Sequence, residues 1–359
     1  MVLNIHGGNI YLIARERGKT TREIIDYSAN INPLGFSLRI KKVLMNCEEL
    51  IRNYPDRDAY DLIREISRYH NISDDSILAG NGSTEFIFLL PRVLKPKKTL
   101  LVIPTFSEYE AGIQKVNGRV FYFKTHEADA FVINTKKLFK ELKKGYDALY
   151  ICNPANPTGV LTAKETLTDI LKCAQRIGTQ VIIDETFIDF NEAHSMKHTI
   201  PEFENLYILR SMTKFFGLPG LRAGYILSSK KNIAKLREQQ EPWMMNALAQ
   251  YASIESLKDQ QFIIETILYV QEARKKLISG LATIPNLKIF PSAANYLLLR
   301  LDKSAPMTVF ELYENLLMKG IIIRKCDSFK GLNENFFRIA VRTDRENNKL
   351  IKNIRSFLL

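Results

Sequence analysis

Residues 180–214 read QVIIDETFIDFNEAHSMKHTIPEFENLYILRSMTK, and this stretch decides the fold. It contains two short apolar runs, Gln180–Ile183 and Leu206–Leu209, that each lead into polar residues. Apolar runs of this length, rich in β-branched and aromatic residues, are typical of strands that are buried on both faces. The stretch therefore predicts two strands of a covered sheet, one followed by Asp184 and the other by Lys214.

Similar apolar runs lie on both sides of this stretch and alternate with helical patterns. The further strand candidates are Thr99–Ile103, Ala148–Cys152 and Gly224–Leu227, and one clear helical pattern covers Lys164–Ile177. Strands separated by helices favour a mostly parallel sheet that is covered on both faces, which is the α/β class. The sequence therefore predicts a large α/β domain over residues 41–240.

The two ends of the chain have a different character. The C-terminal third begins with a long helical stretch, continues with alternating segments and closes with a helix. These segments are Met245–Ser279, Asn295–Leu301, Phe336–Val341 and Lys349–Phe357. We expect a smaller α+β domain over residues 241–359. The first 40 residues are turn-rich, and we expect residues 1–40 to form an arm and part of the small domain.

The composition excludes several classes of protein. The chain has 359 residues, 46% of them hydrophobic, which is ample for two packed cores. Its net charge of +12 comes from scattered Lys and Arg residues, so we expect anionic substrates and no nucleic-acid partner. No CxxC pair, signal peptide or membrane-length apolar run is visible, so we expect a cytoplasmic protein without a membrane partner. His194 and His198 stand outside an HExxH pattern, so we expect no metal site.

Two further polar clusters follow strand candidates, at the position where open α/β sheets bind their ligands. The first, Gly80–Glu85 (GNGSTE), offers glycines, hydroxyls and a helix start to a phosphate, although an ordinary capped turn has the same pattern. The second, Asn153–Gly159 (NPANPTG), is stiffened by two prolines and can present an amide to a ligand oxygen. The lysine of Ser211–Lys214 lies next to hydroxyls and can act as a nucleophile toward carbonyl groups.

The order of these motifs resembles that of fold-type I pyridoxal-5'-phosphate (PLP) enzymes, the class I/II aminotransferase superfamily. NPANPTG is followed by Asp184, by Ser-Met-Thr-Lys at 211–214 and by Gly-Leu-Arg-Ala-Gly-Tyr at 220–225. The resemblance implies the fold of that superfamily, a large domain with a mostly parallel seven-stranded sheet plus a smaller α+β domain. It also implies PLP as the cofactor, carried by Lys214 as a Schiff base, and a homodimer.

The same resemblance implies a role for individual residues. Lys214 would shuttle protons, and Asp184 would pair with the pyridine N–H. Asn156 would bond the ring hydroxyl, and Tyr109 would stack on the ring. The cofactor phosphate would be held by hydroxyl and guanidinium groups and by a tyrosine that reaches across the dimer interface. These residues are Ser83, Thr84, Ser211, Arg222 and Tyr54, with Thr213 beside them in the cofactor site.

One position departs from the usual pattern of the superfamily. Many aminotransferases have a tyrosine three residues after the pyridine aspartate, and this chain has Phe187 there. Asn156 would then be the main partner of the ring hydroxyl. The departure is compatible with cofactor binding and argues mildly against an efficient general transaminase.

Within the superfamily the chain resembles the L-threonine-O-3-phosphate decarboxylases of cobalamin biosynthesis. The similarity rests on HGGNI at 6–10, DYSANINPLG at 26–35 and FRIAVR at 337–342, and it runs over nearly the whole chain. It implies a PLP-dependent carboxy-lyase that converts L-threonine O-3-phosphate to (R)-1-amino-2-propanol O-2-phosphate, or L-serine O-phosphate to ethanolamine phosphate. The carboxylate and phosphate of this small substrate would be bound by basic and amide side chains. These are His6, Asn32, Asn156, Arg324, Arg338 and Arg342.

Two alternatives remain open on the sequence. Histidinol-phosphate aminotransferases also handle a phosphorylated amine, and Phe187 together with the HGGNI motif counts against this assignment. A catalytically silent ligand-binding module with the same fold is the second alternative.

Overall fold

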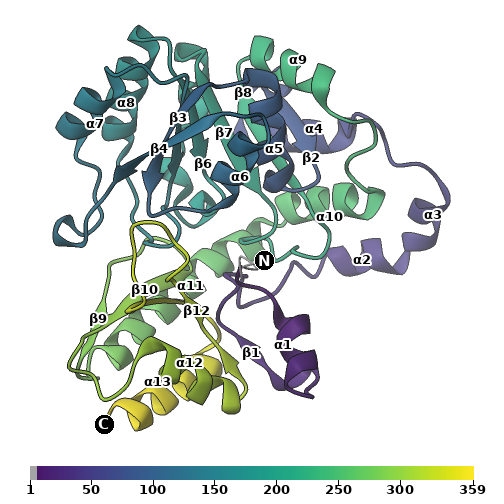
Figure 1. Cartoon of the computed structure of the whole chain (residues 1–359). Coiled ribbons are helices and arrows are strands. Elements are labelled where there is room, and N and C mark those ends of the chain that lie inside the picture. Colours follow the sequence, from purple (N-terminus) through teal and green to yellow (C-terminus); the bar gives the residue numbers. More distant parts are fainter. Residues whose placement is uncertain (1–5) are drawn as a thin grey trace.

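A seven-stranded sheet forms the centre of the larger part of the chain (Figure 1). The structure, a computed structural model, describes residues 6–359, so residues 1–5 of the expected arm lie outside the described residues. In spatial order the strands are β2 (Ile77–Gly80), β8 (Gly224–Ser228), β7 (Leu206–Ser211), β6 (Gln180–Asp184), β5 (Ala148–Cys152), β3 (Lys98–Ile103) and β4 (Arg119–Lys124). β8 runs antiparallel to both of its neighbours, and all other neighbouring pairs are parallel. This confirms the predicted α/β class and the mostly parallel sheet of seven strands.

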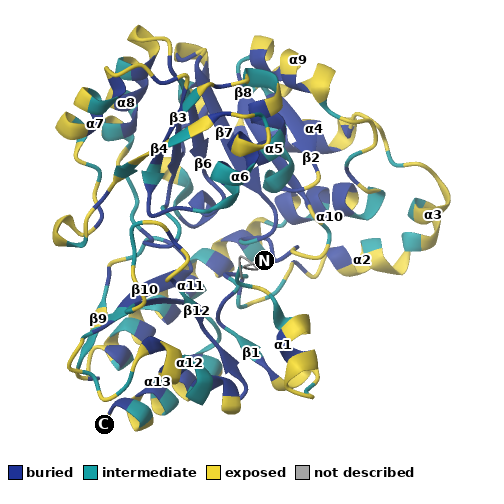
Figure 2. Cartoon of the chain, viewed as in Figure 1, coloured by how far each residue is buried: buried dark blue, intermediate teal, exposed yellow. Residues whose placement is uncertain are grey.

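Helices cover both faces of the sheet, and Figure 2 shows the buried strands between half-exposed helices. One face is covered by α4 (Tyr60–His70), α7 (Thr135–Leu142), α8 (Lys164–Arg176) and α10 (Ala247–Lys258), and the other by α5 (Ser83–Leu94), α6 (Glu108–Gln114) and α9 (Lys230–Gln239). Ile183 and Ile208 pack into the first core, whereas Ile182 and Leu209 pack into the second. Because side chains alternate along a strand, the residues that follow, Asp184 and Arg210, also point to opposite faces of the sheet.

The helical stretch that the sequence predicts over Met245–Ser279 consists of two helices in the structure, α10 and α11 (Gln260–Leu281). Asp259 separates them: its Oδ1 accepts the Phe262 N–H at 3.1 Å as the N-cap of α11. Its Oδ2 accepts the hydroxyl of Ser37 at 2.5 Å. An aspartate whose carboxylate is used in this way starts a new helix instead of continuing the old one.

The smaller part of the chain contains a four-stranded antiparallel sheet and three helices. In spatial order the strands are β12 (Arg324–Lys325), β13 (Phe336–Ala340), β10 (Tyr296–Leu301) and β9 (Leu287–Ile289), and the helices are α11, α12 (Val309–Met318) and α13 (Asp344–Leu358). α11 joins the two parts, because Ile263 and Val270 lie in a core of the large part and Leu277 and Leu281 in the core of the small part.

The N-terminal segment packs against the smaller part. β1 (Ile25–Asp26) pairs in parallel with β11 (Ile321–Ile322). α1 (Ile10–Glu16) contributes Ile13 and Ala14 to a small apolar cluster with residues of α12 and β11. α2 (Ile40–Met45) and α3 (Cys47–Arg52) then lead into the larger part. Residues 6–9 therefore precede a segment that is fixed to the smaller part.

Candidate active site

A cavity of about 620 Å³ lies where the carboxyl ends of the central strands face the smaller part. Cys152, Asp184 and Ser211, the last residues of β5, β6 and β7, line it from the larger part, and Arg338 of β13 lines it from the smaller part. The cavity brings together twelve of the predicted site residues, which are His6, Ser83, Thr84, Tyr109, Asn156, Asp184, Ser211, Thr213, Lys214, Arg222, Arg324 and Arg338.

Lys214 follows β7, and its side chain lines the cavity. Removal from water, together with the positive charges of Arg338 and Arg222, lowers the pKa of its amine to about 8. An amine with this pKa has a sizeable unprotonated fraction near neutral pH, and only that form attacks a carbonyl group. The main-chain N–H of Asn32 donates to the carbonyl oxygen of Lys214 at 3.0 Å, which fixes the loop.

Asp184 ends β6 and accepts two hydrogen bonds. Its Oδ2 accepts the hydroxyl proton of Tyr109 at 2.5 Å, and its Oδ1 accepts the N–H of Thr186 at 2.9 Å. Burial raises the pKa of this carboxyl, and the donors and the charge of Lys214 oppose that rise. A buried carboxylate needs a counter-charge, so Asp184 is suited to a cationic N–H group within the cavity.

Helix α5 begins at the cavity with Ser83 and Thr84. Gly82 precedes them with a φ of 80°, and a Cβ there would lie 2.9 Å from Nη2 of Arg222. A Cβ on Gly224 would lie 2.4 Å from the main-chain nitrogen of Ser83. The two glycines therefore let a helix N-terminus and a guanidinium approach each other closely, a combination that binds phosphate well.

Arg324 and Arg338 approach the cavity from the smaller part. Arg338 donates to Oδ1 of Asn156 and, at 2.8 Å, to the carbonyl oxygen of Ser28, and its Nε is buried without a partner. Arg324 donates to Oγ of Ser328 at 2.7 Å. All these acceptors are neutral, and within residues 6–359 neither guanidinium forms an ion pair. Because a buried charge without a counter-charge is costly, this side of the cavity is suited to bind anions.

The N-terminal arm reaches the cavity through His6, Gly7 and Gly8. Nε2 of His6 lies 2.8 Å from Oε1 of Glu108 at the start of α6. A Cβ on Gly7 would lie 2.1 Å from the carbonyl oxygen of Ser28, so only glycine lets the arm come this close. The arm thus extends from the smaller part to α6 of the larger part beside the cavity.

Two residues that we predicted to bind substrate, Asn32 and Arg342, lie outside the lining of this cavity. Asn32 is buried, and its Nδ2 donates to the carbonyl oxygen of Phe215 at 2.7 Å and to Oγ1 of Thr266 at 3.0 Å. Arg342 pairs through Nη2 with Oε1 of Glu346 at 2.9 Å. Both side chains are therefore occupied by neighbours within the fold, and Asn32 supports the loop that carries Lys214.

Tyr54 also lies away from the cavity of its own chain. Its side chain is 85% exposed, and its ring packs against that of Trp243 with 5.4 Å between the centroids. The resemblance places this tyrosine in the site of a partner chain, so its role stays a prediction.

The cavity also contains residues that the sequence reasoning did not assign. Asp26, Ser28 and Thr186 line it, and Glu108 holds His6. Asp26 and Ser28 lie in the DYSANINPLG motif, and Thr186 follows Asp184 by two residues. Closeness in sequence to assigned residues was the available signal for these three, whereas nothing in the sequence connects Glu108 with the arm.

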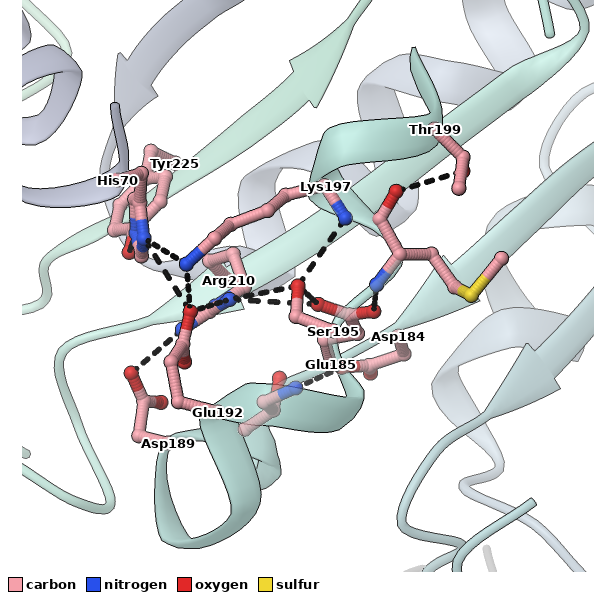
Figure 3. A network of polar contacts seen from close by, with 12 residues as sticks. His70, Asp184, Glu185, Asp189, Glu192, Ser195, Lys197, Thr199, Arg210 and Tyr225 are labelled. Atoms are coloured by element: carbon pink, nitrogen blue, oxygen red, sulfur yellow. Dashed lines mark hydrogen bonds and ion pairs between the residues drawn. The ribbon is translucent and has the colours of Figure 1, made fainter. Parts of the chain in front are cut away.

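A buried ionic cluster surrounds Arg210 of β7, close to Asp184 (Figure 3). Arg210 is fully buried, and its Nη2 contacts Oδ1 of Asp189 at 2.7 Å and Oε2 of Glu192 at 2.6 Å. Its Nη1 lies 3.4 Å from Oε2 of Glu185. Burial raises the pKa of Glu185 to about 7, although the charge of Arg210 opposes this rise. The cluster ties together the ends of β6 and β7, the two strands that lead into the cavity.

Residues 6–359 contain neither a membrane-spanning helix nor a cluster of metal ligands. None of the helices in this range is long and apolar enough to cross a membrane. The His, Cys, Asp and Glu side chains of this range form no group of three or more that could hold a metal ion.

Comparisons with known proteins agree with this geometry. The family model described as Aminotransferase class I and II matches residues 22–354. The threonine-phosphate decarboxylase of Salmonella typhimurium is 34% identical over 355 residues, 98% of this chain and 96% of that protein. The adenosylcobalamin biosynthesis bifunctional protein CobDQ of Leptospira interrogans is 33% identical over 98% of this chain and 41% of that protein. A crystal structure of the histidinol-phosphate aminotransferase from Clostridium acetobutylicum matches with a TM-score of 0.86 at 33% identity, over 92% of this chain and 98% of that one.

Proposed function

The chain belongs to the class I and II aminotransferase family, and within this family we propose that it removes CO2 from L-threonine O-3-phosphate. The product is (R)-1-amino-2-propanol O-2-phosphate, and L-serine O-phosphate would give ethanolamine phosphate. The Salmonella typhimurium relative, which bears the name of this activity, supports the proposal. The name of the Leptospira interrogans relative supports a place in cobalamin biosynthesis.

The observation that carries the proposal is the unpaired positive charge on the side of the cavity that faces Lys214. Arg324 and Arg338 have neutral acceptors and no carboxylate partner among the described residues. The substrate has two separate anionic groups, so it needs two separate cationic sites. We assign its carboxylate to Arg338, whose planar guanidinium suits forked recognition, and its phosphate to Arg324 with His6.

The residues of the cavity also fit PLP. Arg222 and the start of α5 offer a guanidinium, hydroxyls and free N–H groups to the cofactor phosphate, and the closely approaching Gly82 leaves room for it. At the other end the buried Asp184 is suited to the pyridine N–H, and Lys214 supplies the amine. When bound, PLP supplies an electron sink for the negative charge that develops at the substrate α-carbon.

Asn156 connects the cofactor end of the cavity with the substrate end. Its Oδ1 accepts a hydrogen bond from Arg338, which leaves its amide nitrogen as a donor toward the ring hydroxyl. Phe187 offers no hydroxyl there and instead packs edge-on against Tyr296, with 5.0 Å between the ring centroids. The amide of Asn156 therefore takes the place of the tyrosine hydroxyl that many family members have.

The choice of reaction depends on how the two anionic ends of the substrate are held. Arg338 at one end and Arg324 with His6 at the other determine whether the carboxylate or the α-hydrogen is in position to leave. Lys214, with a pKa near 8, can hold a proton and donate it to the α-carbon after CO2 has left. Decarboxylation therefore requires the small part for orientation and Lys214 for the proton.

A homodimer is part of this proposal. Apolar side chains are exposed before and along α2 and α3, namely Leu38, Met45 and Ile51, and at Trp243, which packs against Tyr54. Exposed apolar side chains of this size are typical of protein interfaces. In such a dimer the exposed Tyr54 would reach the cofactor phosphate of the partner. Light scattering of the purified protein tests this, and a monomer at micromolar concentration would contradict it.

The activity is tested by incubating the purified, PLP-loaded protein with L-threonine O-3-phosphate and measuring CO2 and the amino-alcohol phosphate. We expect both products in equal amounts, and neither from Lys214→Ala. Histidinol-phosphate aminotransferase activity is the second candidate, because the Clostridium acetobutylicum enzyme is 33% identical. Glutamate formed from L-histidinol phosphate and 2-oxoglutarate, without CO2 from threonine phosphate, would establish that candidate instead.

A further inference from the structure

One buried hydroxyl in the cavity has no role in the proposed function. Thr186 lines the cavity and is only 8% exposed. Its Oγ1 is buried and has no hydrogen-bond partner among the described residues. Leaving a buried hydroxyl without a partner is unfavourable, so this atom points to an acceptor that it reaches after a small change in geometry.

The carboxylate of Asp184 is the acceptor within reach of this hydroxyl, and the Thr186 side chain is among the groups that lower the pKa of that carboxyl. The main-chain N–H of Thr186 already donates to Oδ1 of Asp184 at 2.9 Å. In a threonine the hydroxyl oxygen and the main-chain nitrogen are separated by one rotatable bond, so a change of rotamer brings Oγ1 toward the same carboxylate. A carboxylate oxygen accepts more than one hydrogen bond, so the existing N–H bond does not exclude a second one.

Asp184 has a physical need for a further donor. Its carboxyl is buried, and burial raises its pKa, which favours the neutral form. A neutral carboxyl could not balance a positive charge on a pyridine nitrogen. Among the described residues the ionic cluster around Arg210 gives Asp184 no hydrogen bond, because Arg210 pairs with the carboxylates of Glu185, Asp189 and Glu192 (Figure 3). The remaining donors are therefore Tyr109 and Thr186.

We propose that Thr186 is a positioning residue for Asp184: its hydroxyl donates a further hydrogen bond to the carboxylate and keeps it ionised when PLP is bound. The inference rests on the proposed binding of PLP and is independent of which reaction follows. It gives Thr186 a function that valine, which has the same shape, cannot perform.

Two variants separate the hydroxyl from the shape of the side chain. Thr186→Val removes the hydroxyl and keeps the volume, whereas Thr186→Ser keeps the hydroxyl and removes a methyl group. In absorbance titrations of the apoprotein with PLP, we expect Thr186→Val to raise the Kd about tenfold and Thr186→Ser to change it less than about threefold. Thermal unfolding of the three apoproteins shows whether each variant is folded.

A spectroscopic readout and a double-mutant cycle identify the partner of the hydroxyl. The pH at which the visible absorbance of the PLP-loaded protein changes should move upward in Thr186→Val and stay in place in Thr186→Ser. In an Asp184→Asn background, Thr186→Val should have no further effect on PLP affinity, because the charged acceptor is gone.

Three results would overturn the inference. Equal PLP affinity and equal spectral pH dependence of the wild type and Thr186→Val would show that the hydroxyl has no such role. An undiminished effect of Thr186→Val in the Asp184→Asn background would show that the hydroxyl acts on another group. A wild-type protein that does not bind PLP would overturn the proposed function, and with it this inference. A wild-type protein that binds PLP, together with an unaffected Thr186→Val variant, would overturn the inference alone.

Discussion

Arg338 donates a hydrogen bond to Oδ1 of Asn156, and this contact joins β13 of the smaller part to the NPANPTG turn of the larger part. The guanidinium is buried, and it lines the cavity together with the asparagine. The bond thus lies between the groups that we assign to the substrate carboxylate and to the cofactor ring.

Replacing this arginine tests the assignment. Arg338→Lys keeps the charge and loses the planar fork, so we expect kcat/KM for L-threonine O-3-phosphate to fall about 100-fold or more. Affinity for PLP should change less than about threefold, because the cofactor phosphate is held elsewhere. Arg300→Lys is the matched control: Arg300 lies on the neighbouring strand β10 and pairs with Glu127 and Asp302. A similar loss in both variants would contradict a specific role for Arg338.

Attachment of PLP to the apoprotein should accelerate as pH rises through about 8. The pKa of Lys214 is lowered to about 8, so its amine loses its proton well below the usual pH for lysine. Stopped-flow absorbance at about six pH values from about 6 to about 10 defines the midpoint of this acceleration. Arg222→Gln removes one of the positive charges that lower this pKa and should shift the midpoint upward. A midpoint at the ordinary lysine pKa would show that the environment does not tune the amine.

The buried cluster around Arg210 makes stability depend on pH through Glu185. Its pKa is raised from 4.5 to about 7, so the folded protein binds more protons than the unfolded protein between these pH values. This contribution to the free energy of unfolding is full below the lower value and is lost as pH rises toward 7. Relative to Glu185→Gln, the wild type should lose stability on the order of 3 kcal/mol between about pH 4 and pH 8. Urea unfolding of both proteins over this range measures the difference, and parallel pH profiles would refute it.

Two glycines near the phosphate end of the cavity should respond differently to alanine. A Cβ on Gly224 would lie 2.4 Å from the main-chain nitrogen of Ser83, whereas a Cβ on Gly220 would have nothing within 4 Å. We expect Gly224→Ala to destabilise the apoprotein by about 1–3 kcal/mol and Gly220→Ala to stay within about 0.5 kcal/mol. Thermal unfolding of the apoproteins gives both numbers. Equal stability of the two variants would show that the helix start tolerates the added carbon.

Much of the fold and of the chemical centre follows from local sequence. The sequence predicts β6 and β7 from apolar runs of four residues each, Gln180–Ile183 and Leu206–Leu209, and Asp184 and Lys214 stand at or just after the ends of the two strands. In such cases the strand and the residue that it positions are neighbours in the chain. The motif order then supplied the roles, because the carboxyl ends of parallel strands meet at one edge of the sheet.

The remaining assignments depend on contacts between residues far apart in the chain. Asn32 was expected to bind substrate, yet its amide donates to the carbonyl oxygen of Phe215, 183 residues away. The pairing of His6 with Glu108 and the break in the C-terminal helix at Asp259 have the same origin. No local pattern records which acceptor a buried polar side chain will meet, and that partner decides whether the side chain is free for a ligand.

The pairing of β1 with β11 in a separate two-stranded sheet fastens the N-terminal segment to the smaller part, which also carries Arg324 and Arg338. The groups that we assign to the substrate anions therefore belong to one body, and Lys214 and Asp184 belong to the other. Evolution can remodel the first body without disturbing the second. Descendants of one ancestral scaffold could in this way acquire new substrates, and even a different bond to cleave, while inheriting the same electron-handling centre unchanged.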